Sequence, residues 1–339
     1  MDSAWNRLQY LETEPTSRKF LSQCYTNREW EHPDRLAFQQ STRYLYLWRQ
    51  ARLFYQTAES ADLSIQPLLL FYGCTHLLKG MLITRDPAYP QNSRMLQHGV
   101  ASRKVKRQAY VLMEDEIRPQ KEGFFSHLSQ TFRLTPLRDR YSVQDLFASL
   151  AEMSEICAAL SEIQPHWTRL QLSLPVHEGA ASSRREADEY RVTFPVKTEG
   201  SLAYSNDTLK QYIQRLAPST ISLNTIGWEA WSNRQMFLSQ FALSQLEQHP
   251  LFYLHDRTLF FWNGSAESLP LPQWASHFLL LYQLGMLCRY ETEWWGELTM
   301  SHDMAERYLV ERFLAHHMTT FPSLIMKQME LYNQVKFPV

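Results

Sequence analysis

The chain has 339 residues, of which 44% are hydrophobic and 20% are charged, and its formal net charge is −1. This balance is typical of a folded protein with a sizeable core and excludes extensive disorder. Because the net charge is close to zero, no global field attracts the chain to nucleic acid or to a membrane surface, so any such attraction must be local.

The sequence carries neither a recognisable targeting signal nor a metal-binding motif. Residues 1–15 lack the basic start and the apolar core of a signal peptide. The longest apolar run, residues 67–83, is interrupted by His76 and Lys79 and is too short to span a bilayer. The cysteines are scattered and form no CxxC pair, which predicts neither a zinc site nor a disulfide framework. We therefore expect a cytoplasmic protein with no membrane span and no metal or other cofactor.

The first part of the chain predicts a broken helix followed by a helical hairpin. Residues 5–25 form the first predicted helix, which Pro15 interrupts. A long helix follows over residues 34–60, with an aspartate at its start as the cap. The next helix covers residues 64–83 and has a proline in its first turn. The short link between these two helices predicts that they are antiparallel neighbours.

The middle of the chain changes from helical to strand periodicity. Residues 110–113 predict a short strand, and residues 143–163 predict an amphipathic helix. From Trp167 onward, apolar residues alternate with polar ones, as they do in strands. The patterns predict strands at 170–174 and 190–194, helices at 206–216 and 232–248, and a β-hairpin over 251–262 that turns at His255-Asp256-Arg257.

Residues 272–300 predict one helix with an unusual apolar face. Arg289 and Glu293, four residues apart, continue the line of its large apolar side chains. Because charged side chains are rarely buried unless they are paired, we expect an Arg289–Glu293 pair inside the helical body. Two more helices are predicted, over 303–317 and over 322–332.

These elements predict a mainly α protein. Its helical body is made from the N- and C-terminal helices, with a small β-containing section in the middle. We expect an N-terminal helical part over residues 1–165 and a small α+β section over 166–270. C-terminal helices over 271–339 pack back on the N-terminal part.

Three segments of the chain are distinctive: RYETEWWGEL at 289–298, QPLLLFYG at 66–73 and HGVASRKVKRQAYVLMEDEIRPQKEGFF at 98–125. Together they resemble the YaaC-like family of bacterial proteins. The resemblance implies a bacterial cytosolic protein with one architecture along the chain. It transfers no catalytic residue.

A second, weaker resemblance is to the HEPN superfamily of small and often dimeric helical bundles. Many of its members are metal-independent RNases that carry Arg-x4-6-His near the end of a bundle helix, a spacing that Arg312 and His317 match. Phe313 stands where active members usually have a polar residue. The resemblance implies that Arg312 stabilises the scissile phosphate and that His317 shuttles protons.

Two other groups of residues could bind a ligand. Arg289, Glu293, Trp294 and Glu297 are suited to a pocket in which an arginine meets a phosphate and indoles stack on a base. The structural alternative is a buried ion pair with the indoles in the core. The second group is a basic stretch suited to phosphate or nucleic acid, or else a solvated face balanced by nearby acids. It contains His98, Arg103, Lys104, Lys106, Arg107 and, further on, Lys121.

Three hypotheses about function remain. The first is a non-catalytic binding or regulatory protein that holds a nucleotide, another phosphorylated ligand or RNA between the basic stretch and the Arg289–Glu297 helix. The second is a HEPN-like endoribonuclease that uses Arg312 and His317 in a homodimer. The third is a protein–protein interaction module that docks a partner through its tryptophans. The sequence lacks P-loop, GxGxxG, GxSxG and HExxH motifs, and it leaves open whether the protein is an enzyme.

Overall fold

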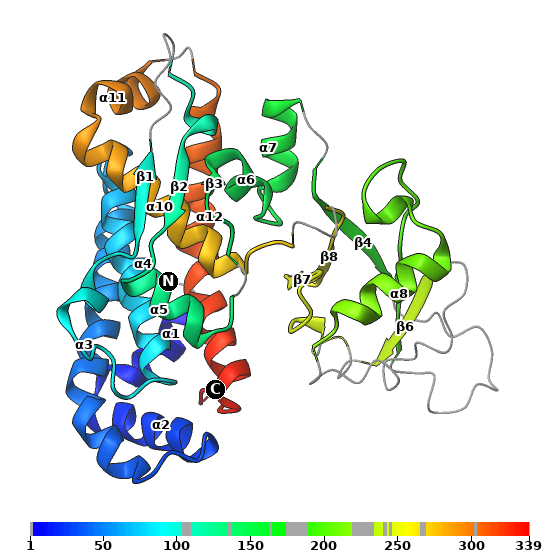
Figure 1. The fold of residues 1–339 in the computed structure, drawn as a ribbon. Coiled ribbons are helices and arrows are strands. Elements are labelled where there is room, and N and C mark those ends of the chain that lie inside the picture. Colours follow the sequence, from blue (N-terminus) through cyan, green and yellow to red (C-terminus); the bar gives the residue numbers. More distant parts are fainter. Residues whose placement is uncertain are drawn as a thin grey trace. The chain divides into compact units, whose positions relative to one another are not determined.

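The computed structural model (Figure 1) divides into two compact units. Unit 1 consists of Met1–Phe147 and Trp274–Val339, and unit 2 consists of Ala148–Gln273. The structure describes residues 3–103, 110–134, 137–162, 165–173, 189–218, 234–239, 243, 246–264, 269–301 and 304–338.

Three long helices form the core of unit 1: α3 (Pro33–Glu59), α4 (Gln66–Ile83) and α12 (Glu306–Asn333). Helix α4 packs along both α3 and α12, so segments from the two ends of the chain lie side by side (Figure 1). Two short helices, α1 (Ser3–Leu8) and α2 (Glu14–Asn27), precede them. The break predicted at Pro15 falls just before α2, because proline is tolerated in the first turn of a helix.

Two glycines of α4 allow α3 to approach closely. A Cβ atom on Gly80 would lie 2.6 Å from the Trp48 ring, and one on Gly73 would lie 2.7 Å from the Tyr55 ring. Any larger residue would have to displace a buried aromatic ring. The glycines that weaken α4 as an isolated helix therefore make its tertiary packing possible.

The prediction of two separate helices over 303–317 and 322–332 is wrong. Helix α12 runs without interruption from Glu306 to Asn333 and contains Pro322. Phe313, His317 and Phe321 lie on one buried face, which Ile325 and Met329 continue past the proline. Burial of that face outweighs the backbone hydrogen bond that the proline cannot donate.

Unit 1 also contains a three-stranded antiparallel sheet, formed by β1 (Val100–Arg103), β2 (Glu116–Pro119) and β3 (Tyr141–Ser142). The strand predicted at 110–113 is wrong, because Leu112–Glu114 forms a 3-10 turn. The backbone N–H of Asp115 donates to the carbonyl of Leu112, which closes the turn and starts β2 one residue later. Two short helices follow, α5 (Phe124–Thr131) and α6 (Val143–Ala148).

The single helix predicted over 272–300 is two helices. Helix α10 (Gln273–Tyr290) ends before Glu291, whose φ of −123° and ψ of 51° are not helical, and α11 (Thr292–Met300) follows. Phe278 anchors α10 in the core, with its ring 5.6 Å from that of Phe71 on α4 and 5.5 Å from that of Phe125 on α5. Trp295 anchors α11, because its indole N–H donates to the carbonyl of Ser64 at 2.7 Å.

The helix predicted over 143–163 is also broken, into α6 and α7 (Ser154–Ser161). The carbonyl of Ser149 accepts from the indole of Trp167 at 2.8 Å and from the side-chain amide of Gln273 at 2.9 Å. The N–H of Ala151 donates to the same Gln273 side chain at 3.0 Å. These side chains satisfy backbone groups that a continuous helix would have paired internally.

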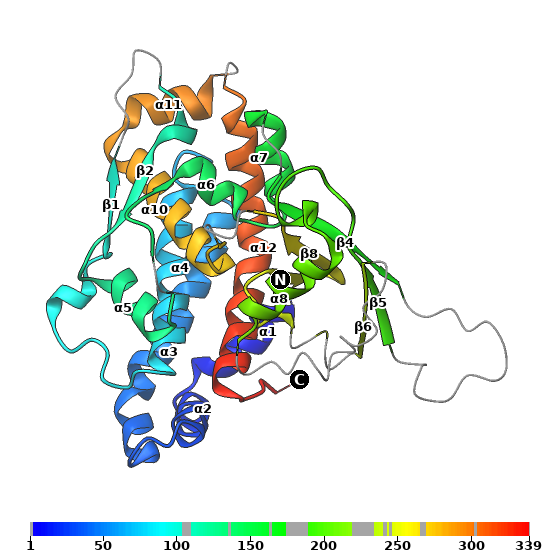
Figure 2. The ribbon, with the colours of Figure 1, turned by 45° about the vertical axis from the view of Figure 1, so that its right-hand side comes forward.

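Unit 2 is built on a five-stranded antiparallel sheet in the order β6-β5-β4-β8-β7. Figure 2 shows β4, β5 and β6 side by side. The strands are β4 (Trp167–Ser173), β5 (Glu189–Thr193), β6 (Gln235–Ser239), β7 (Phe252–His255) and β8 (Thr258–Trp262). Helix α8 (Asn206–Leu216) contributes Leu209 and Ile213 to a core that also contains Phe194 and Phe261.

Two predictions in unit 2 have different outcomes. The hairpin over 251–262 is confirmed, and Asp256 and Arg257 at its turn both have positive φ. The helix predicted over 232–248 is wrong in its first half, because Gln235–Ser239 forms strand β6, whereas Leu243 and Leu246 in its second half are helical. Residue by residue, β6 pairs with β5, and this non-local pairing satisfies its backbone in place of helical bonds.

The predicted fold class is confirmed: the protein is mainly α, with a small β-containing section in the middle. Among the helices of the described residues, none combines the length and the apolar composition needed to cross a membrane. Helices from both ends of the chain pack together in unit 1, and the whole of residues 166–270 lies in unit 2.

Candidate anion-binding site

Three basic side chains from separate segments of unit 1 form a cluster. Lys79 comes from α4, His98 lies just before β1, and Arg289 is in the last turn of α10. The His98 ring packs 5.0 Å from the ring of Phe71 and 5.7 Å from the ring of Tyr282, measured between centroids. All three basic residues are half-buried. We call Lys79, His98 and Arg289 the α4–α10 cluster.

A close contact between two glycines positions His98. Gly99 has a φ of +75° and Gly123 has a φ of +118°, which side chains disfavour. A Cβ atom on Gly123 would lie 2.4 Å from the Cα of Gly99. The N–H of Phe125, in the first turn of α5, donates to the carbonyl of His98 at 3.1 Å. The backbone bends at Gly99, directly after His98, and α5 holds this bend in place.

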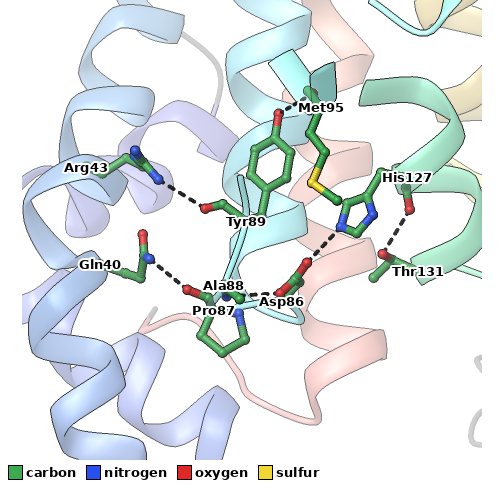
Figure 3. A network of polar contacts seen from close by, with 9 residues as sticks. All are labelled: Gln40, Arg43, Asp86, Pro87, Ala88, Tyr89, Met95, His127 and Thr131. Carbon is green, nitrogen blue, oxygen red and sulfur yellow. Dashed lines mark hydrogen bonds and ion pairs between the residues drawn. The ribbon is translucent and has the colours of Figure 1, made fainter. Parts of the chain in front are cut away.

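A polar network ties the segment between α4 and His98 to two helices, as Figure 3 shows. From α3, Gln40 donates to the carbonyl of Pro87 at 2.7 Å, and Arg43 donates to the carbonyl of Tyr89 at 3.0 Å. From α5, the Nε2 atom of His127 lies 2.7 Å from a carboxylate oxygen of Asp86, and its ring stacks on Tyr89. The segment that leads to His98 is thus fixed at both sides.

A buried network joins the basic stretch to α10. The hydroxyl of Ser102 donates to the side-chain oxygen of Gln283 at 2.6 Å, and the Gln283 amide donates to Asp115 at 2.8 Å. The hydroxyl of Tyr110 donates to the same carboxylate oxygen of Asp115 at 2.7 Å. The Asp115 side chain is completely buried, so these bonds stabilise a charge that is shielded from water. The start of the basic stretch and the helix that carries Arg289 therefore meet in space.

The positive charges of the cluster repel one another. Burial lowers the pKa of His98, and the nearby charges of Arg289 and Lys79 lower it further. Burial also lowers the pKa of Lys79, and Arg43 adds to the effect. Within the described part of the chain, no carboxylate forms an ion pair with Lys79, His98 or Arg289. Lys79 lies over the Phe124 ring, with its Nζ atom 5.8 Å from the ring centre, but no carboxylate among the described residues compensates the positive charge of the cluster.

The Arg289 side chain is held along its own helix. Its Nε atom donates to the carbonyl of Gly285 at 3.0 Å, and one terminal nitrogen lies 3.4 Å from the sulfur of Met286. Its guanidinium carbon lies 5.1 Å from the centre of the Tyr290 ring. These contacts leave guanidinium donors for a ligand, because an arginine carries five N–H groups.

The expected buried Arg289–Glu293 pair is wrong. The helix break at Glu291 separates the two side chains, and Glu293 and Glu297 are both exposed on α11. Trp294 is half-buried, with its ring 5.2 Å from that of Tyr110. The buried Trp295 donates to Ser64, as described above. Of the four ligand-binding residues predicted in this helix, only Arg289 belongs to the cluster.

The other residues of the basic stretch do not belong to the cluster or lie outside the described residues. Arg103 lies opposite Glu116 in the sheet and forms an ion pair with it at 3.4 Å. Arg140 lies 3.2 Å from the same carboxylate, so Glu116 is shared between the two arginines. Lys121 is exposed in the turn before α5. Lys104, Lys106 and Arg107, which were also predicted to bind ligand, lie outside the described residues.

Arg312 and His317 lie in different environments. Arg312 is exposed on α12, whereas His317 is completely buried. The Nε2 atom of His317 lies 2.6 Å from the hydroxyl of Tyr55, and its Nδ1 atom lies 3.0 Å from the Nδ1 atom of His277. Burial lowers the pKa of His317 well below its usual value. The structure therefore does not bring the two residues together at a surface that RNA can reach.

Sequence reasoning missed Lys79, although the signal was present. Lys79 interrupts the apolar run of residues 67–83, and that interruption served only as an argument against a membrane span. The residues on both sides of Lys79 in α4 are buried. A lone cation in such a run indicates a place where charge is needed.

The fold and the cluster together define a mainly α protein with a cationic cluster between α4 and α10. A family model described as YaaC-like Protein matches residues 9–329. Because this match covers nearly the whole chain, the chain belongs to the YaaC-like family. No curated protein matches the chain, and neither does any solved structure. The comparisons do not show the resemblance to the HEPN superfamily.

Proposed function

We propose that the protein is a non-catalytic, cytosolic binding protein that holds a phosphorylated small molecule, such as a nucleotide, at the α4–α10 cluster. The observation that supports this proposal is the convergence of Lys79, His98 and Arg289 without a compensating carboxylate among the described residues. Half-buried cations that repel one another carry an electrostatic cost, and a bound anion removes it.

A phosphate group suits the cluster better than a carboxylate does. Lys79 and Arg289 supply two positive charges, and a phosphate monoester carries nearly two negative charges at neutral pH. Protonated His98 can donate a third charge-assisted hydrogen bond once the anion offsets the repulsion from its neighbours. The rings of Phe71 and Tyr282 are buried and hold the His98 ring in place for that contact.

The proposal is tested by measuring binding of phosphorylated small molecules to the wild-type protein and to two variants. The ligands are inorganic phosphate, nucleoside monophosphates and sugar phosphates, and the readouts are thermal shift and calorimetric titration. We expect at least one ligand to stabilise the protein. Lys79→Gln and Arg289→Gln should each weaken its binding by about tenfold or more, because each removes one charge-assisted contact.

Arg103→Gln is the matched control. It removes a positive charge from the same stretch, but that charge is already paired with Glu116. Binding should therefore be unchanged. A protein that none of the phosphorylated ligands stabilises, or binding that Lys79→Gln and Arg289→Gln leave intact, contradicts the proposal. A short RNA that binds more tightly than every small ligand would identify nucleic acid as the partner instead.

A further inference from the structure

A group of three arginines lies where the C-terminal ends of four helices of unit 1 meet. The hydroxyl of Tyr25 on α2 donates to the carbonyl of Ile83 at the end of α4, at 3.0 Å. Asn333 at the end of α12 donates to the hydroxyl of Thr84 at 2.9 Å, next to the end of α4. The end of α5 joins them, because the ring of Phe132 lies 4.8 Å from the ring of Tyr332.

Three arginines lie within two residues of three of these helix ends. Arg28 follows α2, Arg85 comes two residues after α4, and Arg133 comes two residues after α5. The guanidinium carbon of Arg85 lies 5.1 Å from the centre of the Phe132 ring and 5.2 Å from that of the Tyr332 ring. The Nε atom of Arg85 is buried and has no hydrogen-bond partner. Arg85 is therefore fixed by aromatic contacts and still has an unused donor.

The three guanidinium groups are close enough to repel one another. Burial and the charges of Arg28 and Arg133 lower the pKa of Arg85 to about 10, with an opposing effect from Tyr332. Arg28 is exposed, but partial loss of hydration and the charge of Arg133 lower the pKa of its guanidinium. No carboxylate in the described part of the chain forms an ion pair with any of the three. Positive charge at helix C-termini is favourable, but it does not explain three cations in one place.

We propose that Arg28, Arg85 and Arg133 form a second anion-binding site, which takes a small phosphate-bearing anion with at least two negative charges. A carboxylate would leave two of the three positive charges uncompensated, whereas pyrophosphate or the phosphates of a nucleotide compensate all or most of them. Arg85 already covers Phe132 and Tyr332, so these rings offer no free face for a base. The site therefore recognises the phosphates alone.

The site shares no residue with the α4–α10 cluster, although Arg85 follows the end of α4, the helix that also carries Lys79. The test is made in the Lys79→Gln/Arg289→Gln background, so that failure of the first proposal does not affect it. Pyrophosphate binding is measured by calorimetry and by thermal shift at constant ionic strength. We expect binding in this background, and Arg28→Gln and Arg133→Gln should each weaken it by about tenfold or more. Both arginines are exposed, so both variants should fold.

Arg49→Gln, which removes an exposed arginine from α3, is the matched control and should leave binding unchanged. Without pyrophosphate, Arg133→Gln should keep or raise the melting temperature, because it relieves repulsion. ADP should bind about as tightly as pyrophosphate.

The proposal is overturned if the Lys79→Gln/Arg289→Gln protein does not bind pyrophosphate. It is also overturned if adding Arg28→Gln or Arg133→Gln leaves pyrophosphate binding as tight as before. The same fall in melting temperature with and without pyrophosphate would show that the arginines serve only the helix ends. A clear preference for ADP would contradict recognition of phosphate alone.

Discussion

Two histidine-containing regions of unit 1 differ in a way that separates a structural role from a binding role. His317 and His277 are completely buried, and their polar atoms bond to each other and to Tyr55. His98 is half-buried beside Lys79 and Arg289, and no carboxylate compensates the three among the described residues. Both His98 and His317 are candidate site residues in the sequence.

The difference shows what a binding site requires beyond a suitable residue type. A histidine whose ring nitrogens are already used inside the core is part of the fold, and replacing it should cost stability. A histidine held near surplus positive charge adds little to stability, and its state of protonation depends on what binds beside it.

The largest expected effect is on stability, for His317→Ala. The variant leaves a cavity beside Phe321, whose ring centre lies 4.5 Å from that of His317, and leaves Tyr55 without its hydrogen-bond partner. We expect the free energy of unfolding to fall by about 3–5 kcal/mol, measured by urea denaturation. Arg312→Ala, on the exposed face of α12, should change it by less than about 0.5 kcal/mol.

One result would break the comparison. If the protein cleaves RNA in EDTA and the folded His317→Ala variant does not, the buried histidine has a catalytic role after all. A loss of less than about 1 kcal/mol in His317→Ala would likewise contradict a structural role for the buried pair.

The next effect is on the frame that holds His98. Gly123→Ala would place a Cβ 2.4 Å from the Cα of Gly99, in a backbone conformation with a φ of +118°. We expect this variant to lower the free energy of unfolding by about 2–4 kcal/mol. Gly296→Ala is the matched control, because no atom lies within 4 Å of the added Cβ. It should stabilise α11 by about 0.5–1 kcal/mol, since alanine favours a helix. Equal effects of the two substitutions would contradict the close contact.

The third effect is a dependence of stability on pH. Burial, His317 and His316 lower the pKa of His277 well below 6.5, and burial and His316 lower that of His317. The unfolded chain therefore binds more protons below about pH 6.5, so this stabilisation is present above that pH and is lost as the pH falls. Each histidine contributes a slope of about 1.4 kcal/mol per pH unit. His277→Gln should reduce the slope of unfolding free energy against pH, and an unchanged slope would contradict the expectation.

The smallest effect concerns the pKa of His98 and can be followed by NMR titration of its ring protons. Arg289→Gln should raise this pKa by less than about one unit, because it removes one repelling charge and leaves the burial. Arg103→Gln, whose charge is paired with Glu116, should not change it. His277 and His317 should not titrate in the range where His98 does. If the pKa of His98 is the same in the wild type and in Arg289→Gln, the two residues do not interact, and the α4–α10 cluster is contradicted.

Much of the fold could be predicted from local pattern. The hairpin of α3 and α4 and the β-hairpin of β7 and β8 follow from periodicity, caps and turn residues that lie within a few positions of each other. The errors occurred where distant groups decided the local structure. The break after Ser149 depends on Trp167 and Gln273, and strand β6 depends on its pairing with β5.

The candidate site could be predicted only in part for the same reason. His98 and Arg289 stand out as a histidine before a glycine and an arginine on an apolar helix. Lys79 becomes a partner only through the packing of α4 against α10, and Arg103 is excluded only by its pairing with Glu116. The three arginines at the helix ends are 28, 85 and 133 residues into the chain, and no local pattern relates them.

The order of residues by itself determined that this is a mainly α protein of the YaaC-like family with a β-containing middle, because such features depend on spacing within short segments and on whole-chain similarity. Only the tertiary structure decided which charges are compensated, because folding places a carboxylate or a second cation beside each charged side chain from a distant segment of the chain. Binding capacity depends on that balance of charge.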